Sequence, residues 1–240
     1  MKYLTKLRET LAKNGLTLWS VGNKTVAKNK DIILGTKNRD KAIQMYVDWI
    51  KLLGKSGIKI TIFTWEADGV WSTHDNIVRG NSIARACDVG ILQHEPLKHG
   101  RNYTDEELWE NMRIFLECVV PEAEKHDVTL AIHPNDPPTD KRIAGVPCIM
   151  RTRAAFDRVF ELGNHSKNLR MELCLGTFLE GGTKMGNLLQ CIDHFMQRDK
   201  VVIVHLRNVT NIVPSFTETF IDEGYGDVYE LVRRVVKNRY

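Results

Sequence analysis

The sequence lacks the features of a membrane or secreted protein. None of its apolar runs approaches the length of about 18 residues that indicates a membrane span. The first ten residues, MKYLTKLRET, carry charges where a signal peptide would be apolar. The five cysteines are odd in number, and no two have a Cys-x-x-Cys spacing. The sequence therefore predicts a reduced, cytoplasmic protein.

Several catalytic and binding motifs are also missing. Nothing resembles a nucleophile elbow or a Ser-His-Asp set, and the glycines after residue 175 match no phosphate-binding fingerprint. The net charge of +4 is a mild excess, without the concentrated basic face of a nucleic-acid binder. We therefore expect a small molecule as the partner, and neither a nucleic acid nor a membrane. The positive net charge is compatible with an anionic small molecule.

Strand-like and helix-like segments alternate along the chain. Several of the strand-like segments are continuously apolar, as strands buried on both faces should be. The expected strands are 16–21, 59–65, 129–134, 169–175 and 201–209, and the main expected helices are 40–53, 104–124 (bent or broken at Pro121), 152–162, 185–196 and 227–236. Residues 22–38 and 66–103 are expected to be loops, the second of them a lid or pocket wall.

This alternation predicts an α/β fold, a parallel (β/α) barrel of the TIM type, as a single domain over residues 1–240. A closed barrel takes eight strands, so the first and last strands are expected to be missing from this chain. The exposed sheet edge left behind would favour self-association. We therefore expect a homo-oligomer.

Three metal-capable side chains end three consecutive expected strands. His133 closes TLAIH, Cys174 closes LRMELC and His205 closes VVIVH. The strand ends of such a barrel surround its active site, so the three should converge. A His₂Cys set suits Zn²⁺, Mn²⁺ or Fe²⁺ better than Mg²⁺. The alternative is that the two histidines and the cysteine are separate residues, each hydrogen-bonded on its own. The matching register of the three strand ends makes this alternative less favourable.

Further polar residues lie two positions from these three and so share their faces. The pairs are His133 with Asn135, Glu172 with Cys174, and His205 with Arg207. Arg207 could bind a carboxylate through both guanidinium nitrogens, or form a surface ion pair. Glu172 could be a ligand, a base or a partner of a basic side chain, and Trp71 a pocket wall or a core residue. Asp136, Glu172, Glu218 and Asp227 are the other candidate proton acceptors.

Four motifs in order resemble the mannonate dehydratase family, which has a xylose-isomerase-like barrel. They are His133-Pro-Asn-Asp-Pro-Pro138 (family pattern HPDDPP), LCLGTF (173–178), His205-Leu206-Arg207, and FTETFIDEGYGDVYEL (216–231). The likeness covers most of residues 16–236. Two positions differ, because Asn135 stands for an Asp, and Cys148 for an Arg of the following loop. The family's fourth ligand, an Asp followed by His on its last strand, is expected beyond residue 240.

The resemblance implies a cytoplasmic, Mn²⁺-dependent lyase of hexuronate catabolism, with His133, Cys174 and His205 as ligands. It would convert D-mannonate or a close aldonate to 2-keto-3-deoxy-D-gluconate or its equivalent. Asn135, Arg207 and Trp71 would bind the sugar acid, and Arg207, Asp136 and Glu172 would act in catalysis. Fe²⁺ or Zn²⁺ could replace Mn²⁺. The alternatives are a sugar isomerase or epimerase of the same barrel class, or an inactive barrel remnant that binds a sugar acid.

Overall fold

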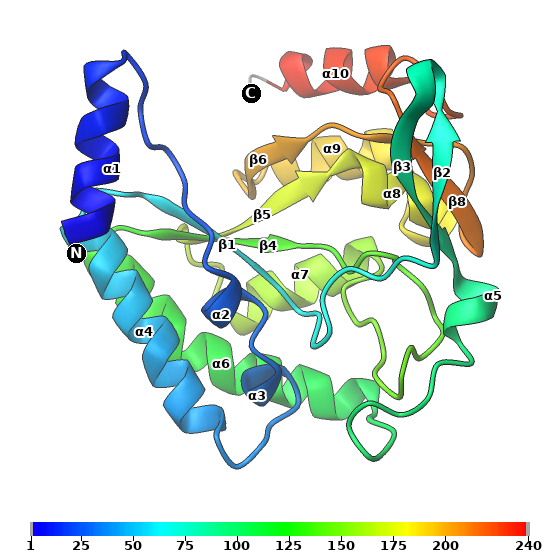
Figure 1. The fold of residues 1–240 in the computed structure, drawn as a ribbon. Helices are drawn as coiled ribbons and strands as arrows, with labels where there is room; N and C mark the ends of the chain where they lie inside the picture. Colours follow the sequence, from blue (N-terminus) through cyan, green and yellow to red (C-terminus); the bar gives the residue numbers. More distant parts are fainter. Residues whose placement is uncertain (1, 239–240) are drawn as a thin grey trace.

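The computed structural model describes residues 2–238 and is built on a parallel sheet (Figure 1). The order of its strands is β1-β4-β5-β6, so each strand of the sheet lies beside the one that precedes it in the chain. The sequence predicted all four of them, three with nearly these bounds; the strand expected over 201–209 ends at His205, and residues 208–209 belong to another sheet. The four strands are β1 (Ile60–Thr64), β4 (Thr129–His133), β5 (Leu169–Cys174) and β6 (Val201–His205).

The prediction of a strand over residues 16–21 was wrong. Only Ser20 bridges Ile60 in parallel, and the amide of Val21 donates to the Ile60 carbonyl at 3.1 Å. Leu16 and Trp19 are half or more exposed, so the segment lacks the burial that its apolar residues suggested. It lies along the outer edge of β1.

The α/β class and the parallel sheet are confirmed. Within residues 2–238 no strand joins β6 to β1, and the sheet is open. That the first and last barrel strands are missing, and that the chain is a single domain, stay predictions.

The five main predicted helices form at nearly the expected residues and cover the sheet (Figure 1), whereas the short helix over Leu175–Gly181 was not predicted. The expected capping box is present, since the Glu107 amide donates to Thr104 Oγ1 at 3.1 Å and the Thr104 amide to Glu107 Oε2 at 2.8 Å. Pro121 neither ends nor divides its helix. No helix of the described residues is long and apolar enough to cross a membrane. The helices are α1 (Lys2–Lys13), α4 (Arg39–Lys55), α6 (Asp105–His126), α7 (Arg153–Leu162), α8 (Leu175–Gly181), α9 (Leu188–Met196) and α10 (Val228–Lys237).

Residues 22–38, expected to be a loop, contain two short helices, α2 (Lys24–Ala27) and α3 (Lys30–Ile33). The side chains of Asn23 and Asn29 cap their first turns. Val26, Ile32 and Ile33 anchor the segment in the core. One-turn helices show no periodic apolar pattern, so sequence periodicity could not reveal them.

The segment 66–103 was also wrongly expected to be a loop, because it contributes to a second, antiparallel sheet of order β2-β3-β8-β7. The insertion after β1 supplies two strands, and residues after β6 supply the other two. Ala86, Cys87 and Asp88 pair with Thr217, Phe216 and Ser215. In Figure 1 this sheet lies beside the C-terminal ends of the parallel strands. Its elements are β2 (His74–Val78), η1 (Arg79–Asn81), β3 (Ser82–Asp88), α5 (Val89–Leu92), β7 (Asn208–Val209) and β8 (Ser215–Thr219).

Candidate metal centre

The structure brings His133, Cys174 and His205 together at the ends of β4, β5 and β6. One ligand atom from each lies within 4.8 Å of those of the other two. Cys174 Sγ is 3.4 Å from His205 Nδ1, and the two imidazole rings have centroids 6.3 Å apart. Side chains from three separate strands that share so small a space can contact one ion. That they bind a metal stays a prediction.

The charges of these residues favour a thiolate. Burial of Cys174 opposes its ionisation, but hydrogen bonds from His133 and His205 outweigh burial and hold the pKa of the thiol well below its usual range. Burial also acts against the charged form of His133, yet the Cys174 sulfur raises the pKa of that histidine to about 9. A second hydrogen bond to the Cys174 sulfur, made by His205, raises the pKa of His205. The thiolate is the form of cysteine that binds metals.

The backbone selects the coordinating nitrogen of His133. Its Nδ1 lies 2.7 Å from the carbonyl oxygen of Pro134. A carbonyl only accepts hydrogen bonds, so Nδ1 carries a proton in both charge states of the ring, and Nε2 is the nitrogen that could bind a metal after it loses its proton. Metal-binding histidines commonly donate their second nitrogen in this way.

Two further side chains adjoin the cluster. Thr177 Oγ1, in the first turn of α8, donates to Cys174 Sγ at 3.2 Å. Glu172 Oε1 lies 3.9 Å from His205 Nδ1. Burial raises the pKa of Glu172. Glu172 is therefore a carboxylate next to the cluster that accepts a proton more readily than an exposed glutamate.

A group of two arginines and three carboxylates, here called the arginine–carboxylate network, lies beside the cluster. Arg207 donates to Glu218 Oε1 at 2.7 Å and to Asp136 Oδ2 at 3.0 Å, and it also contacts Glu180. Arg85 donates to Asp136 Oδ1 at 2.7 Å and to Glu218 Oε1 at 2.9 Å. Sequence reasoning missed Arg85 and Glu180, which lie on β3 and α8, because neither element was predicted.

The three carboxylates of the network are close enough to hold an ion, but the two guanidinium groups already form ion pairs with them. Burial opposes ionisation of Asp136, yet Arg207 and Arg85 lower the pKa of this carboxyl. Burial and the Asp136 charge raise the pKa of Glu180 well above its usual range. The network is thus an internal ion-pair cluster.

Arg207 is buried, as predicted, with 14% of its side chain exposed. Its terminal nitrogens are already engaged by the network and by Thr177 Oγ1 at 3.1 Å. Binding of a substrate carboxylate by Arg207 stays a prediction, and its ion pairs make that role less favourable than it looked in the sequence.

The two other residues predicted to bind substrate follow strand ends of the parallel sheet, Asn135 after β4 and Trp71 after β1. Asn135 is 2% exposed; its amide donates to the Trp65 carbonyl at 2.9 Å and accepts from the Met150 amide at 2.7 Å. Its side chain therefore fixes the loop after β4. The Trp71 ring lies 4.0 Å from Lys98 Nζ. The roles of Asn135 and Trp71 toward a substrate stay predictions.

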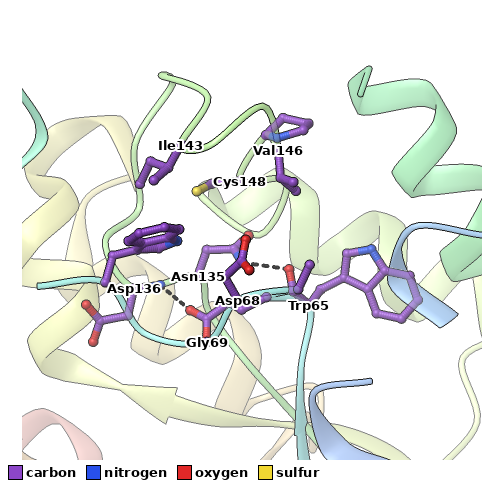
Figure 2. Close-up of a pocket in the computed structure, with 12 residues that line it drawn as sticks. Trp65, Asp68, Gly69, Asn135, Asp136, Ile143, Val146 and Cys148 are labelled. Carbon is purple, nitrogen blue, oxygen red and sulfur yellow. Dashed lines mark hydrogen bonds between the residues drawn. The ribbon is translucent and has the colours of Figure 1, made fainter. Parts of the chain in front are cut away.

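Asn135 and Trp71 both line a pocket between the residues that follow β1 and the loop that follows β4 (Figure 2). The pocket encloses about 310 Å³, counting its open mouth. Its lining residues are Trp65, Glu66, Ala67, Asp68, Gly69, Trp71, Asn135, Asp136, Ile143, Val146, Pro147 and Cys148. Trp71 is thus a pocket wall, one of the two fates that the sequence left open.

Comparison with known proteins identifies the family. The family described as "D-mannonate dehydratase (UxuA)" matches residues 1–88 and 88–240. The chain belongs to the mannonate dehydratase family. Members of this family are hydro-lyases. A mannonate dehydratase of Oceanobacillus iheyensis is 30% identical over 94% of this chain and 69% of its own length. One of Thermotoga neapolitana is 27% identical over 97% of this chain and 73% of its own length.

Solved structures of the mannonate dehydratase family and of related barrels share the fold. The mannonate dehydratase of Streptococcus suis serotype 2 superposes with a TM-score of 0.84 at 24% identity, covering 100% of this chain and 69% of its own. A xylose isomerase domain protein of Planctomyces limnophilus has a TM-score of 0.61 at 8% identity, covering 100% and 73%. The neighbours are thus xylose-isomerase-like TIM barrels, as the sequence predicted.

The fourth ligand expected for the mannonate dehydratase family is not at the cluster in residues 2–238. The one Asp-His dipeptide of the chain, Asp193-His194, lies on α9. Asp193 there binds Arg234 and Asn238. This pair belongs to a helix–helix contact between α9 and α10.

Proposed function

We propose that this protein dehydrates D-mannonate, or a closely related aldonate, to the 2-keto-3-deoxy acid. A divalent ion held by His133, Cys174 and His205 would be its cofactor, Mn²⁺ or alternatively Fe²⁺ or Zn²⁺. The observation that carries the proposal is the convergence of these three side chains in a member of a hydro-lyase family.

The three side chains fit a first-row divalent ion. They offer one thiolate and two imidazoles, a soft-to-borderline donor set that disfavours Mg²⁺ and Ca²⁺. The low pKa of Cys174 supplies the anionic sulfur without further reorganisation. Three protein ligands would leave coordination positions open, as catalytic metal sites require.

The reaction needs charge stabilisation and a base. The bound ion supplies Lewis acidity, which stabilises the negative charge that develops when the proton next to the carboxylate is removed. Glu172 is the proton acceptor next to the cluster, 3.9 Å from His205 Nδ1, and burial raises its pKa, which makes it a stronger base than an exposed glutamate. Asp136, also predicted to act in catalysis, is a weaker base, since Arg207 and Arg85 stabilise its anion. Its neighbour contacts suit it better to hold the two arginines in place.

The proposal is tested by loading the purified protein with Mn²⁺, Fe²⁺ or Zn²⁺ and measuring three quantities. Elemental analysis gives the metal stoichiometry, calorimetry gives the affinity for D-mannonate, and a colorimetric assay detects the 2-keto-3-deoxy acid. We expect one ion per chain, binding of D-mannonate and formation of the product. A loaded protein that binds none of a panel of aldonates would refute the proposed function.

A further inference from the structure

We propose that Lys28, and not Arg207, is the residue that pairs with the carboxylate of the substrate. The inference rests on the proposed function and adds to it the side chain that selects an acid over a neutral sugar. It is carried by two observations. Buried carboxylates hold terminal nitrogens of Arg207 and Arg85, and Lys28 lies at the end of β1, the strand that pairs with the end of β4 at His133.

The arginines beside the centre are committed to the protein. Arg207 and Arg85 share Asp136, Glu180 and Glu218, and all three of these carboxylates are at least partly buried. A substrate carboxylate that took Arg207 from them would leave buried charges without their partner, which is strongly unfavourable. Binding of a substrate carboxylate by one of these guanidinium groups is therefore unfavourable.

The ammonium group of Lys28 is less constrained by its neighbours than the guanidinium groups are. Its side chain is 34% exposed, and its Nζ lies 3.6 Å from Glu66 Oε2, too far for a good hydrogen bond. No hydrogen bond from Lys28 Nζ is found among the residues that the structure describes. An ammonium group has three donors, so Lys28 can accept a new anionic partner and keep its attraction to Glu66.

Lys28 lies at the C-terminal end of β1, beside the strand that carries His133. Its Nζ is 3.6 Å from Glu66 Oε2, and Thr64, two residues before Glu66, pairs with His133 of β4. Its side chain lies over Gly69, where a Cβ would be 4.0 Å from Lys28 Cδ. Gly69 and Glu66 line the pocket of Figure 2. The ammonium group is therefore close to that pocket and to the strand end next to His133.

The backbone around Lys28 is held in place before any ligand binds. Lys28 is the first of the two residues between α2 and α3, and the capping side chains of Asn23 and Asn29 flank it on both sides. The Asn29 amide also donates to the Thr25 carbonyl at 3.2 Å. Val26 anchors the same turn in the core. A preorganised cation loses less entropy on binding than one on a mobile loop.

Glu66 does not cancel the effect of Lys28. Burial and the neighbouring Asp136 raise the pKa of Glu66. Its Oε1 accepts a hydrogen bond from the Asp136 amide at 2.6 Å, which fixes the carboxyl group. The raised pKa favours the neutral carboxyl, so Glu66 competes with a substrate carboxylate for Lys28 less than an exposed glutamate would.

The test compares D-mannonate with its neutral amide, D-mannonamide, as ligands of the Mn²⁺-loaded protein in calorimetry. Lys28→Met removes the charge and keeps the aliphatic stem. We expect it to weaken D-mannonate binding about 10- to 100-fold, the effect of losing a hydrogen bond to a charged group. Binding of the amide and the manganese content should not change. Lys28→Arg, which keeps the charge, should lose less affinity.

Lys30→Met is the matched control, because Lys30 is exposed and lies on the same segment. It should bind both ligands as the wild type does. Equal D-mannonate affinities in the Lys28→Met and Lys30→Met proteins would overturn the inference and leave the proposed function intact. A wild-type protein that takes up manganese but binds no aldonate would overturn both.

Discussion

Replacing Arg207 by methionine should destabilise the fold, because the arginine–carboxylate network would lose one of its two cations. Arg207 donates to Glu218 at 2.7 Å and to Asp136 at 3.0 Å, and only 2% of the Asp136 side chain is exposed. Removing one partner of a buried ion pair costs about 3–5 kcal/mol. Arg85 stays in contact with Asp136 and Glu218, and Glu180 can hold a proton, so we expect the lower end, about 3 kcal/mol. For a chain of this size that lowers Tm by roughly 6–12 °C.

The measurement is urea and thermal unfolding of the metal-free Arg207→Met protein, with Arg233→Met as control. Arg233 forms an exposed pair with Glu230 in the first turns of α10, and surface pairs of this kind contribute little. The network contributes most at neutral pH. Arg207 helps to lower the pKa of Asp136, so its contribution is present above the unfolded-state pKa of about 3.9 and is lost as pH falls through that region. The deficit of the variant should therefore shrink on acidification. Equal midpoints for the two variants at pH 7 would show that the network does not stabilise the fold.

Three further outcomes concern the metal centre. Thr177→Val should weaken metal binding about 10-fold and shift the sulfur-to-cobalt absorption band of the Co²⁺-substituted protein, whereas Thr177→Ser should preserve both; an unchanged band in the valine variant would exclude this role. Metal affinity, measured by competition with a chelator, should rise with pH up to about 9, because the raised pKa of His133 means that a proton must leave before the metal binds; a flat profile from about pH 6 upward would contradict the proton competition. Glu172→Gln should lower turnover about 10²–10⁴-fold with unchanged metal content, and full turnover would assign the base elsewhere.

The sequence predicted the parallel sheet and the metal cluster for the same reason. Apolar runs such as TLAIH and VVIVH can be recognised as buried strands without knowing which strands they pair with. In a parallel sheet the residues at the ends of such strands lie along one edge. His133, Cys174 and His205 could thus be placed together although 41 residues separate the first two and 31 the last two.

The arginine–carboxylate network could not be predicted in the same way. Arg85 lies on β3, a strand whose partners are β2 and the distant β8, and its burial pattern is mixed. Short amphipathic strands that pair across more than a hundred residues leave no periodic signal in one sequence. Lys28 was missed for a related reason, since it lies between two one-turn helices that read as a polar loop. The expected strand at 16–21 failed because apolar residues at a sheet edge can stay exposed, as Trp19 does.

The second sheet couples two insertions of the chain, the one that follows β1 and the one that follows β6. One enters the sheet through β3 and the other through β8, and three residue pairs join them, from Ala86–Thr217 to Asp88–Ser215. A change in either insertion that displaces these paired residues also removes the hydrogen-bonding partner of the other insertion. Loop grafts between members of this family should therefore succeed only when both insertions are transferred as a set, and natural changes in one should be accompanied by changes in the other.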